Sequence, residues 1–516
     1  MMNTKRVEYG DFQTPLELCS VVTAFLRSAG VAPDVIVEPT CGLGSFVSAS
    51  VNEFPDALDI YAFDINPEHI ANLRKSLPIR NGQRYHIKYC NFFEMDWPKF
   101  FSTLPGRILV IGNPPWVTNS ALGVLKSENL PEKSNFQRLK GFAAKTGKAN
   151  FDISEWMLIK LLEALNQKQA CLAMLSKTST ARKLLRHAWL NRLNISKSSV
   201  HLIDSKKYFD VSVDACLLVT HTGVAGPTPR ASVYRSLSFD DRVTTFGLVG
   251  KELVADIEEY LRLRDIDGIA YYTWRSGVKH DAASVMEFTR RGTAFLNGLG
   301  EEWALEPSHL FPLLKSSDIA NGRLVPQKYV LLTQRRTSDD TQQIEEAAPK
   351  TWQYLLRHSA QLDKRRSIIY EKRSRFAIFG VGDYAFSPWK VAISGLYKNC
   401  RFEVIGKHQG KPIVLDDTCY FIPCESEAEA QFVCGLLNSD IGQRFLHSLV
   451  FFDAKRPITT DVLNRIDLKR LAQRLNREKE AQKFLRYAAA FEDGQPLLVF
   501  EGKGKYRAKI SRRRGT

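Results

Sequence analysis

Short runs rich in strand-forming residues alternate with helical stretches between residues 34 and 221, and this alternation limits the choice of fold more than any other feature of the sequence. Strands that alternate with helices predict a mostly parallel sheet with helices on both of its faces. Beside the runs, residues 16–26 and 154–165 place apolar side chains at helical spacing. We therefore expect an α/β domain with seven strands. The expected strands are residues 34–37, 60–64, 85–90, 107–111, 170–175, 200–203 and 215–221.

A break in this pattern follows the last run. Residues 223–229 contain two glycines and two prolines, which predicts a boundary between domains. We assign residues 1–225 to the α/β domain and residues 226–500 to a second domain of α+β type. Residues 501–516 form a basic tail that we expect to be disordered.

Positive charge is concentrated in the second part of the chain. The whole sequence has 72 Lys and Arg against 56 Asp and Glu, which gives a net charge of +16. Residues 226–516 hold 46 of the basic residues against 36 acidic ones, and so contribute +10 of that excess. This balance favours a polyanionic partner, and a solvated basic surface is the alternative.

A glycine-containing turn follows the first expected strand. Residues 35–46 run from an apolar strand through Gly42 and Gly44 into a helix, which lets a ligand approach the backbone closely. Asp64 ends the next expected strand, 20 residues after Gly44, where a carboxylate can accept hydrogen bonds from both hydroxyls of a ribose. Glu38 would repel a pyrophosphate, so a positively charged cofactor such as S-adenosylmethionine is favoured over a dinucleotide. The alternative is a structural tight turn in an unrelated α/β protein.

The fourth expected strand leads into the turn Asn113-Pro114-Pro115-Trp116. The two prolines fix φ and remove two N–H donors, which leaves rigid carbonyl acceptors beside the Asn side-chain oxygen. Such a turn can accept both hydrogens of an exocyclic amino group, and Trp116 can stack on a planar ring. A plain strand terminator is the alternative, which the preceding cofactor loop disfavours.

In their order, these motifs resemble those of the gamma group of N6-adenine DNA methyltransferases from bacterial restriction-modification systems. Residues 11–15 resemble the family's N-terminal cofactor motif, and residues 151–152 and 172–177 continue the order. The resemblance implies a Rossmann-like, seven-stranded, S-adenosylmethionine-dependent methyltransferase domain followed by a target-recognition domain. It implies cofactor binding by Thr14, Pro15, Glu38, Pro39, Thr40, Gly42, Gly44, Asp64, Ile65, Asn91, Phe92 and Asn113.

The reaction implied by the resemblance is site-specific methyl transfer to the N6 amino group of an adenine flipped out of duplex DNA. Asn113 Oδ1 and the Pro114 carbonyl would accept the amino hydrogens, while Trp116 and Phe209 would stack on the base. The sequence departs from the family at Asn91, where Asp is usual, and at Trp116, where Tyr is more common. The catalytic residues implied are Asn113, Pro114, Pro115, Trp116 and Phe209.

The second domain carries further, less specific similarity to these enzymes. Residues 274–280, 379–384 and 455–458 resemble target-recognition regions. Double-stranded DNA is therefore the expected partner, and a separate restriction endonuclease is compatible with the resemblance.

Other functions are compatible with parts of the pattern. The Asn-Pro-Pro-Trp turn also resembles enzymes that methylate protein glutamine or guanine N2 in RNA, although these seldom carry so long a C-terminal region. A non-catalytic DNA-binding subunit would have no need of both intact motifs. A cytosine-C5 enzyme would need a Pro-Cys nucleophile near the cofactor motifs, whereas Cys follows Pro only at Cys424. We find no convincing nuclease motif.

Neither a metal nor a membrane is expected. The nine cysteines form no C-x-x-C pair and have no histidine beside them at zinc-ligand spacing, so we expect buried free thiols. The first residues contain no apolar signal region, and no run of 18 apolar residues occurs. We therefore expect a cytoplasmic protein.

Overall fold

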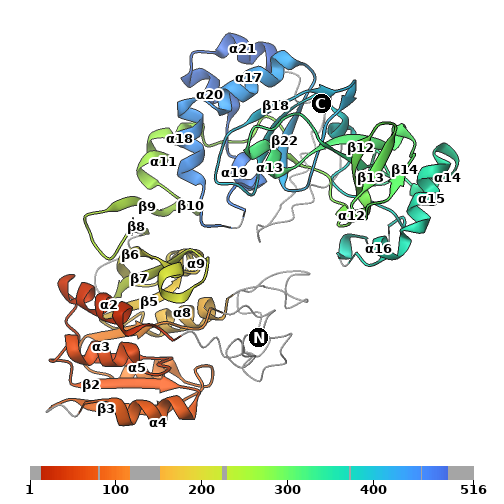
Figure 1. Ribbon diagram of the computed structural model, residues 1–516. Helices are drawn as coiled ribbons and strands as arrows, with labels where there is room; N and C mark the ends of the chain where they lie inside the picture. Colours follow the sequence, from red (N-terminus) through yellow and green to blue (C-terminus); the bar gives the residue numbers. More distant parts are fainter. Residues whose placement is uncertain are drawn as a thin grey trace, which may run out of the picture. The chain divides into compact units, whose positions relative to one another are not determined.

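The computed structural model describes residues 13–78, 82–116, 152–223, 229–365, 367–370, 373–454 and 456–485. The chain forms two compact units that divide between Glu258 and Glu259 (Figure 1). This division lies beyond the boundary near residue 225 that the sequence predicts, because residues 230–254 pair with the sheet of the first unit. Some residues of the predicted motifs and tail lie outside the described part: residues 11–12, 151, 455 and 501–516.

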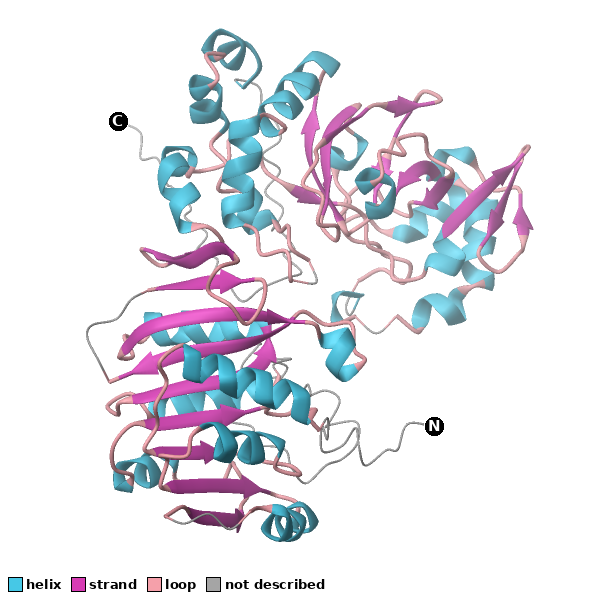
Figure 2. Cartoon of the chain, turned by 60° about the vertical axis from the view of Figure 1, so that its left-hand side comes forward, coloured by secondary structure: helices cyan, strands magenta, loops and turns pink. Residues whose placement is uncertain are grey.

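The first unit is built on one sheet of ten strands (Figure 2). In sheet order they are β10 (Glu252–Val254), β9 (Arg242–Val249), β8 (Arg230–Tyr234), β6 (Ile195–Ile203), β7 (Ala215–Thr222), β5 (Ala170–Lys177), β4 (Ile108–Gly112), β1 (Val35–Glu38), β2 (Asp59–Asp64) and β3 (Arg84–Tyr89). The five strands from β5 to β3 in this order are parallel, and β7 is antiparallel to both of its neighbours.

The seven expected strands correspond to β1 through β7, but the count of seven is wrong for the sheet as a whole. β8 pairs with the outer edge of β6, and β9 and β10 follow it. The added strands satisfy backbone groups that the edge of β6 would otherwise leave unpaired. The Gly- and Pro-rich break at residues 223–229 therefore joins two parts of one sheet.

Helices cover both faces of this sheet. The helices α2 (Leu16–Ser28), α3 (Ser45–Glu53) and α4 (Pro67–Ser76) share one apolar core with Ile36 and Leu109 of the sheet. Successive strand residues point to opposite faces, and Val37 and Val110 are also fully buried, so the other face is covered as well. The remaining α-helices among the described residues of this unit are α5 (Trp97–Thr103), α8 (Ile153–Ala164), α9 (Thr178–Leu190) and the short α10 (Ser205–Phe209). Of these, α8 packs on both α5 and α9.

The strand order reverses at β1, which lies between β2 and β4. Val35 pairs with Asp59 of β2 on one side and with Ile108 of β4 on the other. The chain continues from β1 to β2 and β3 on one side and then returns to β4 on the other. In open α/β sheets such a reversal leaves a crevice at the carboxyl ends of the strands, where ligands bind. The loop after Glu38 and the turn after Gly112 therefore leave the sheet side by side.

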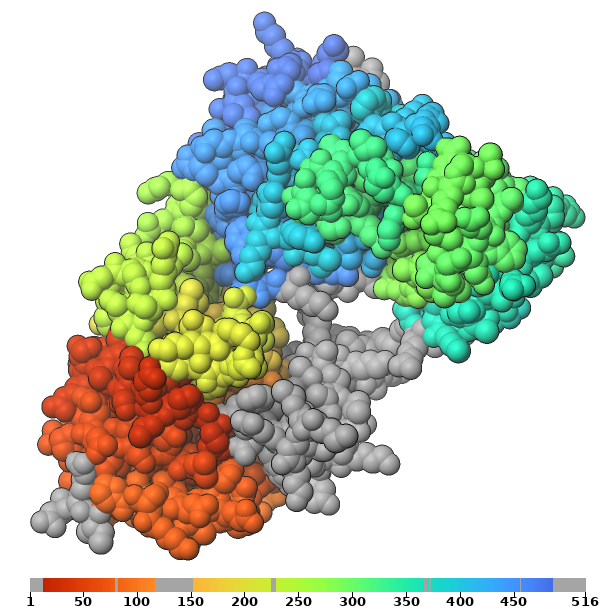
Figure 3. Space-filling view, in the orientation of Figure 1, coloured from red at the N-terminus to blue at the C-terminus, as the bar shows by residue number. Residues whose placement is uncertain are grey.

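The second unit combines sheets with helices. Its sheets are β11 (Arg275–Ser276), β22 (Cys419–Cys424), β17 (Trp389–Ser394), β18 (Glu403–Ile405); β14 (Glu302–Trp303), β13 (Ala294–Asn297), β12 (Glu287–Arg291), β16 (Lys328–Leu331), β15 (Leu310–Leu314), β21 (Val414–Leu415); and β19 (Lys407–His408), β20 (Lys411–Pro412). Their pairings are antiparallel except for β15 with β21. Figure 3 shows the green, teal and blue segments of this unit packed against one another.

The helices of the second unit are mostly short. They are α12 (Ala283–Met286), α13 (Ser316–Ala320), α14 (Ile344–Ala347), α15 (Pro349–Arg357), α16 (Ser359–Asp363), α17 (Glu427–Leu437), α18 (Asp440–Leu449), α19 (Thr460–Leu463), α20 (Leu468–Arg474) and α21 (Glu478–Phe484), while α11 (Ile257–Leu263) spans the division between the units. Within the described ranges, no helix has both the length and the apolar character that crossing a membrane requires.

Candidate active site

The loop between β1 and α3 needs glycine at two positions. Gly42 and Gly44 have φ of +52° and +83°, in the left-handed region that other residues rarely adopt. A Cβ atom on Gly44 would also lie 2.2 Å from Cδ1 of Leu73 on α4. The loop can therefore follow this path only because both positions lack a side chain.

Asp64 connects this loop to the end of β2. Its Oδ2 accepts a hydrogen bond from the Gly42 amide at 2.8 Å, and its Oδ1 accepts one from the Asn66 amide at 2.8 Å. His69 Nδ1 lies 3.4 Å from the same Oδ1 atom. A carboxylate has about four lone-pair positions, so Asp64 retains capacity to accept hydrogen bonds from a ligand. Ile65, the next residue, is partly buried.

Residues 13–15, which belong to the N-terminal motif, bridge the glycine loop and the Asn-Pro-Pro turn. Gln13 Oε1 accepts a hydrogen bond from the Leu43 amide at 3.0 Å. Thr14 Oγ1 accepts one from Asn113 Nδ2 at 3.2 Å, and Pro15 precedes the first residue of α2. The bond to Thr14 uses one N–H of Asn113 Nδ2 and orients the amide, so that its buried Oδ1 oxygen remains available as an acceptor for a ligand.

Buried polar atoms without hydrogen-bond partners gather at this end of the sheet. Within the part of the chain that the structure describes, they include Glu38 Oε2, Thr40 Oγ1, Asn113 Oδ1 and Trp116 Nε1. Leaving a buried donor or acceptor unsatisfied costs about 1–3 kcal/mol, so folded proteins rarely tolerate several together. Their concentration in one place therefore indicates a site built to receive polar groups of a ligand.

The most perturbed acid of the site is Glu38. Burial raises the pKa of its carboxyl well above the usual range, the Val47 N–H opposes that rise, and the negative charge of Asp64 adds to it. Pro39 beside it is buried as well. A buried carboxyl of this kind is stabilised in its charged form by a cation, so the crevice favours a positively charged ligand.

A cavity of about 150 Å³ adjoins the Asn-Pro-Pro-Trp turn. Trp116 and Phe209 meet at its wall with ring centroids 5.5 Å apart and planes inclined by 62°. The structure thus brings together the two aromatic residues that the sequence predicts. A base stacked between two rings needs about 7 Å between their planes, twice a carbon contact of about 3.5 Å, so these rings must separate to admit one. The lining residues are Asn113, Pro114, Trp116, Lys177, Phe209, Val211 and Val213.

Asn91 and Phe92 follow the end of β3. Asn91 Oδ1 accepts a hydrogen bond from the Phe93 amide at 3.1 Å, and its Nδ2 donates to Glu94 Oε1 at 2.9 Å. Phe92 is buried, and its carbonyl accepts a hydrogen bond from Trp97 Nε1 at 3.0 Å. The structure places both residues at the carboxyl edge of the sheet, while their contact with an adenine stays a prediction.

The sequence patterns do not single out two residues of the site, Gln13 and Lys177. Both lie within segments that resemble the family's motifs, but neither is predicted to contact a ligand or to support the site. A lysine directly after the buried residues Ala170–Ser176 was the available signal for Lys177, because a charged side chain at the end of a buried strand usually has a specific partner.

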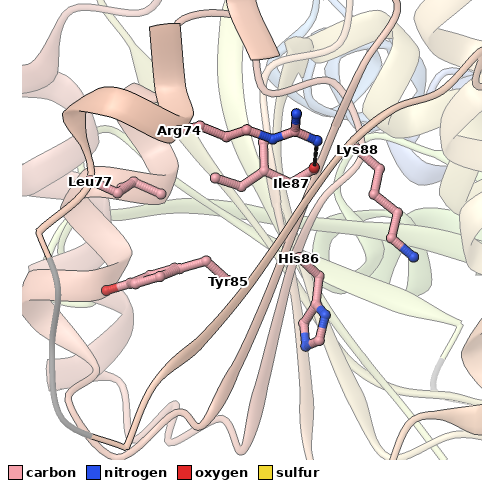
Figure 4. Close-up of a pocket in the computed structure, with 6 residues that line it drawn as sticks. All are labelled: Arg74, Leu77, Tyr85, His86, Ile87 and Lys88. Carbon is pink, nitrogen blue, oxygen red and sulfur yellow. Dashed lines mark hydrogen bonds between the residues drawn. The ribbon is translucent and has the colours of Figure 1, made fainter. Parts of the chain in front are cut away.

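A second hollow, of about 470 Å³, lies on the outer edge of the sheet at β3 and contains none of the predicted site residues (Figure 4). Arg74 Nη2 donates to the Ile87 carbonyl at 2.6 Å there, which covers part of the free strand edge. The hollow therefore belongs to the protection of an edge strand. Its lining residues are Arg74, Leu77, Tyr85, His86, Ile87 and Lys88.

In the second unit, the three segments with recognition-like motifs converge. Lys279 forms an isolated antiparallel bridge with Phe379, and Lys279 Nζ and Arg456 Nη2 each lie 3.9 Å from Asp417 Oδ2. Arg275, in the segment 274–280, is only 7% exposed, and its guanidinium lies 4.6 Å from the centroid of the Tyr384 ring. Arg275 therefore supports the fold of this region, while Lys279 is the better candidate for a ligand contact.

All nine cysteines are free thiols, as the sequence predicts, and all except the partly exposed Cys90 are buried. Among the residues described, no group of three His, Cys, Asp or Glu side chains is placed to hold a metal ion.

Comparison with known proteins defines the class to which this fold and site belong. No protein-family model matches the chain. The chain is 44% identical over 470 residues to the type II methyltransferase M.NspV of Nostoc sp., with 91% of this chain and 98% of that protein aligned. The protein is thus a methyltransferase. It belongs to the type II methyltransferase family of M.NspV.

A solved structure shares the fold over most of the chain. The type IIL restriction-modification enzyme MmeI, solved in complex with DNA, aligns with a TM-score of 0.57 at 12% sequence identity. The match covers 90% of this chain and 69% of MmeI. At this identity the likeness concerns the fold alone.

The buried carboxyl of Glu38 predicts a pH-dependent stability difference. A carboxyl whose pKa is raised by folding contributes stability that is present below the unfolded-state pKa, about 4.3, and is lost as pH rises through the folded-state pKa. Glu38→Gln keeps an acceptor but removes the ionisation, so its Tm should exceed that of the wild type at pH 8 and match it near pH 4. Thermal unfolding of the ligand-free protein across this range measures the difference.

Asp56→Asn is the matched control, since it removes a carboxylate from an exposed turn of the same unit. Its Tm difference from the wild type should not grow with pH. A Glu38→Gln difference that is constant from pH 4 to pH 8 would show that folding does not raise the pKa of Glu38.

Proposed function

We propose that this protein transfers a methyl group from S-adenosylmethionine to the N6 amino group of adenine in duplex DNA. The observation that carries the proposal is Asn113 Oδ1, a buried acceptor without a partner among the described residues, held toward the site by the Nδ2 bond to Thr14. An exocyclic amino group supplies the donor that this oxygen lacks. The neighbouring Pro114 lines the same cavity and offers a backbone carbonyl as a second acceptor.

The residues around the glycine loop fit S-adenosylmethionine, which supplies a methyl group on a positively charged sulfur. The buried Glu38 carboxyl favours that positive charge. Asp64, at the end of β2, would accept hydrogen bonds from the ribose hydroxyls, and Ile65 would be a further cofactor contact. Gly42 and Gly44 allow close approach of the backbone. We assign the adenine contact to Asn91 and Phe92 on the resemblance of this motif.

In the proposed mechanism, the target adenine leaves the DNA stack, at a cost of a few kcal/mol, and enters the cavity beside Trp116 and Phe209. Stacking on these rings offsets part of that cost. Asn113 Oδ1 and the Pro114 carbonyl accept the two N6 hydrogens, which turns the nitrogen lone pair toward the methyl group. They also stabilise the positive charge that develops on nitrogen, and one proton is then released to water.

DNA as the substrate is supported by charge and by the likeness to MmeI, which was solved with DNA bound. Residues 226–516 contribute +10 of the net charge of +16. We propose that the second unit recognises the DNA sequence and that the protein is the modification component of a restriction-modification or phage-defence system, with a separate endonuclease as its partner. The segments around Lys279, Phe379 and Arg456 are the proposed contact region.

Asn113 gives the direct test of the reaction. Asn113→Ala removes the acceptor for the amino group, so incorporation of labelled methyl into DNA should fall to background while S-adenosylmethionine still binds in calorimetry. Asn113→Asp keeps an acceptor oxygen and should retain part of the activity. Methyl transfer by Asn113→Ala at the wild-type rate, or transfer by the wild type to RNA or protein alone, would reject the proposal.

Lys279 gives a test of DNA binding by the second unit. If Lys279 contacts a phosphate, Lys279→Ala should weaken binding to all DNA sequences alike and lower the slope of log affinity against log salt by about 1. Lys251→Ala, which removes an exposed lysine of the first unit, should leave the slope unchanged. Altered sequence preference in Lys279→Ala would assign this side chain to base reading, and unchanged affinity would remove it from the interface.

A further inference from the structure

The turn after β4 needs hydrogen-bond donors from elsewhere in the protein. Pro114 and Pro115 have no N–H groups, so this part of the turn cannot be tethered by its own backbone donors. At its start the turn is held by the bond between Asn113 and Thr14. At its other end, Lys177 Nζ donates to the Trp116 carbonyl at 3.3 Å. Lys177 is the last residue of β5, the strand beside β4.

Asp152 holds the Lys177 ammonium group in place. Lys177 Nζ lies 2.5 Å from Asp152 Oδ2, and the two side chains are 25% and 8% exposed. The other oxygen, Asp152 Oδ1, caps α8 by accepting hydrogen bonds from the Ser154 amide at 3.1 Å and from its hydroxyl at 2.8 Å. A helix end therefore fixes the carboxylate, which in turn fixes the lysine.

We infer that Lys177 and Asp152 are positioning residues for methyl transfer. Lys177 acts through the Trp116 carbonyl, so that Asn113 Oδ1 and the Pro114 carbonyl stay aligned with the amino group that they accept. The Lys177 ammonium group lies at the wall of the cavity, and the Asp152 carboxylate balances its charge. The pair therefore adds little net charge beside the reacting nitrogen. The inference rests on the proposed function for the reaction that it affects.

The chain offers a matched control ion pair nearby, between α8 and α9. Lys183 of α9 and Glu155 of α8 form an ion pair with Nζ and Oε2 2.9 Å apart, and the Glu155 side chain is 5% exposed. Lys183 is not among the residues that line the cavity. Loss of this pair reports what one α8–α9 ion pair contributes to stability without involving the Asn-Pro-Pro-Trp turn.

The experiment compares four variants of the full-length protein. Lys177→Met removes the ammonium group and keeps a side chain of similar length, while Lys177→Arg keeps the positive charge and the hydrogen-bond donors. Asp152→Asn keeps the Oδ1 atom that caps α8. Lys183→Met breaks the control pair. The measurements are the single-turnover rate at saturating S-adenosylmethionine and DNA, the Kd of S-adenosylmethionine, and the Tm. Lys177→Met should lower the rate about 10- to 100-fold, as expected for a misplaced reacting group, with cofactor Kd changed by less than about twofold. The single-turnover rate of Asp152→Asn should lie between those of Lys177→Met and the wild type.

The control and the rescue separate positioning from general damage. Lys183→Met should change the rate by less than about twofold even if its Tm falls as far as that of Lys177→Met, and Lys177→Arg should recover most of the rate. Equal rates in Lys177→Met and Lys183→Met, or a loss of cofactor affinity as large as the loss of rate, would overturn the inference while leaving the proposed function in place. A wild-type protein that transfers no methyl group to any DNA would overturn both.

Discussion

The hydrogen bond from Asn113 Nδ2 to Thr14 Oγ1 is the contact on which the account of the site depends. It joins two segments that lie 99 residues apart in the sequence, and it leaves the Asn113 Oδ1 oxygen as a buried acceptor. Because β1 and β4 are neighbours in the sheet, the loops that follow them leave it side by side, and residues 13–14 before α2 bond to both loops. Strand order thus determines which chemical groups meet, and one hydrogen bond determines which atom of Asn113 faces a ligand.

Electrostatics divide the crevice into two parts with different tasks. The glycine-loop side contains two acids, Glu38 and Asp64, and favours a ligand that carries positive charge. On the other side, the Lys177 charge is compensated by Asp152, and the cavity wall is formed mainly by rings, valines and neutral acceptors. A neutral planar base with an amino group suits this second environment. The acidic side of the crevice therefore suits the positively charged cofactor that we propose, and the nearly neutral side suits the uncharged base.

Much of the first unit could be predicted from local patterns, because each buried strand appears as a short apolar run. The extra strands β8 to β10 could not, since a Gly- and Pro-rich break looks the same whether it joins two domains or two strands of one sheet. The position of Lys177 after a buried strand indicates that it has a partner, but the local sequence does not identify Asp152 as that partner. The convergence of Lys279 with Arg456 near Asp417 is likewise a tertiary contact that local sequence does not reveal. The burial of Arg275 could not be predicted either, because a charged residue is expected to be exposed unless its partner is known.

The central claim, that the acceptors of the Asn-Pro-Pro-Trp turn select an exocyclic amino group of adenine, can be tested by identifying the product. Duplex DNA incubated with the purified protein and S-adenosylmethionine is digested to nucleosides, and the methylated nucleoside is identified by mass spectrometry. The account predicts N6-methyladenine and no other methylated base. Recovery of N4-methylcytosine would keep the chemistry of the turn but contradict the assigned base, and recovery of C5-methylcytosine would contradict the role of Asn113 altogether.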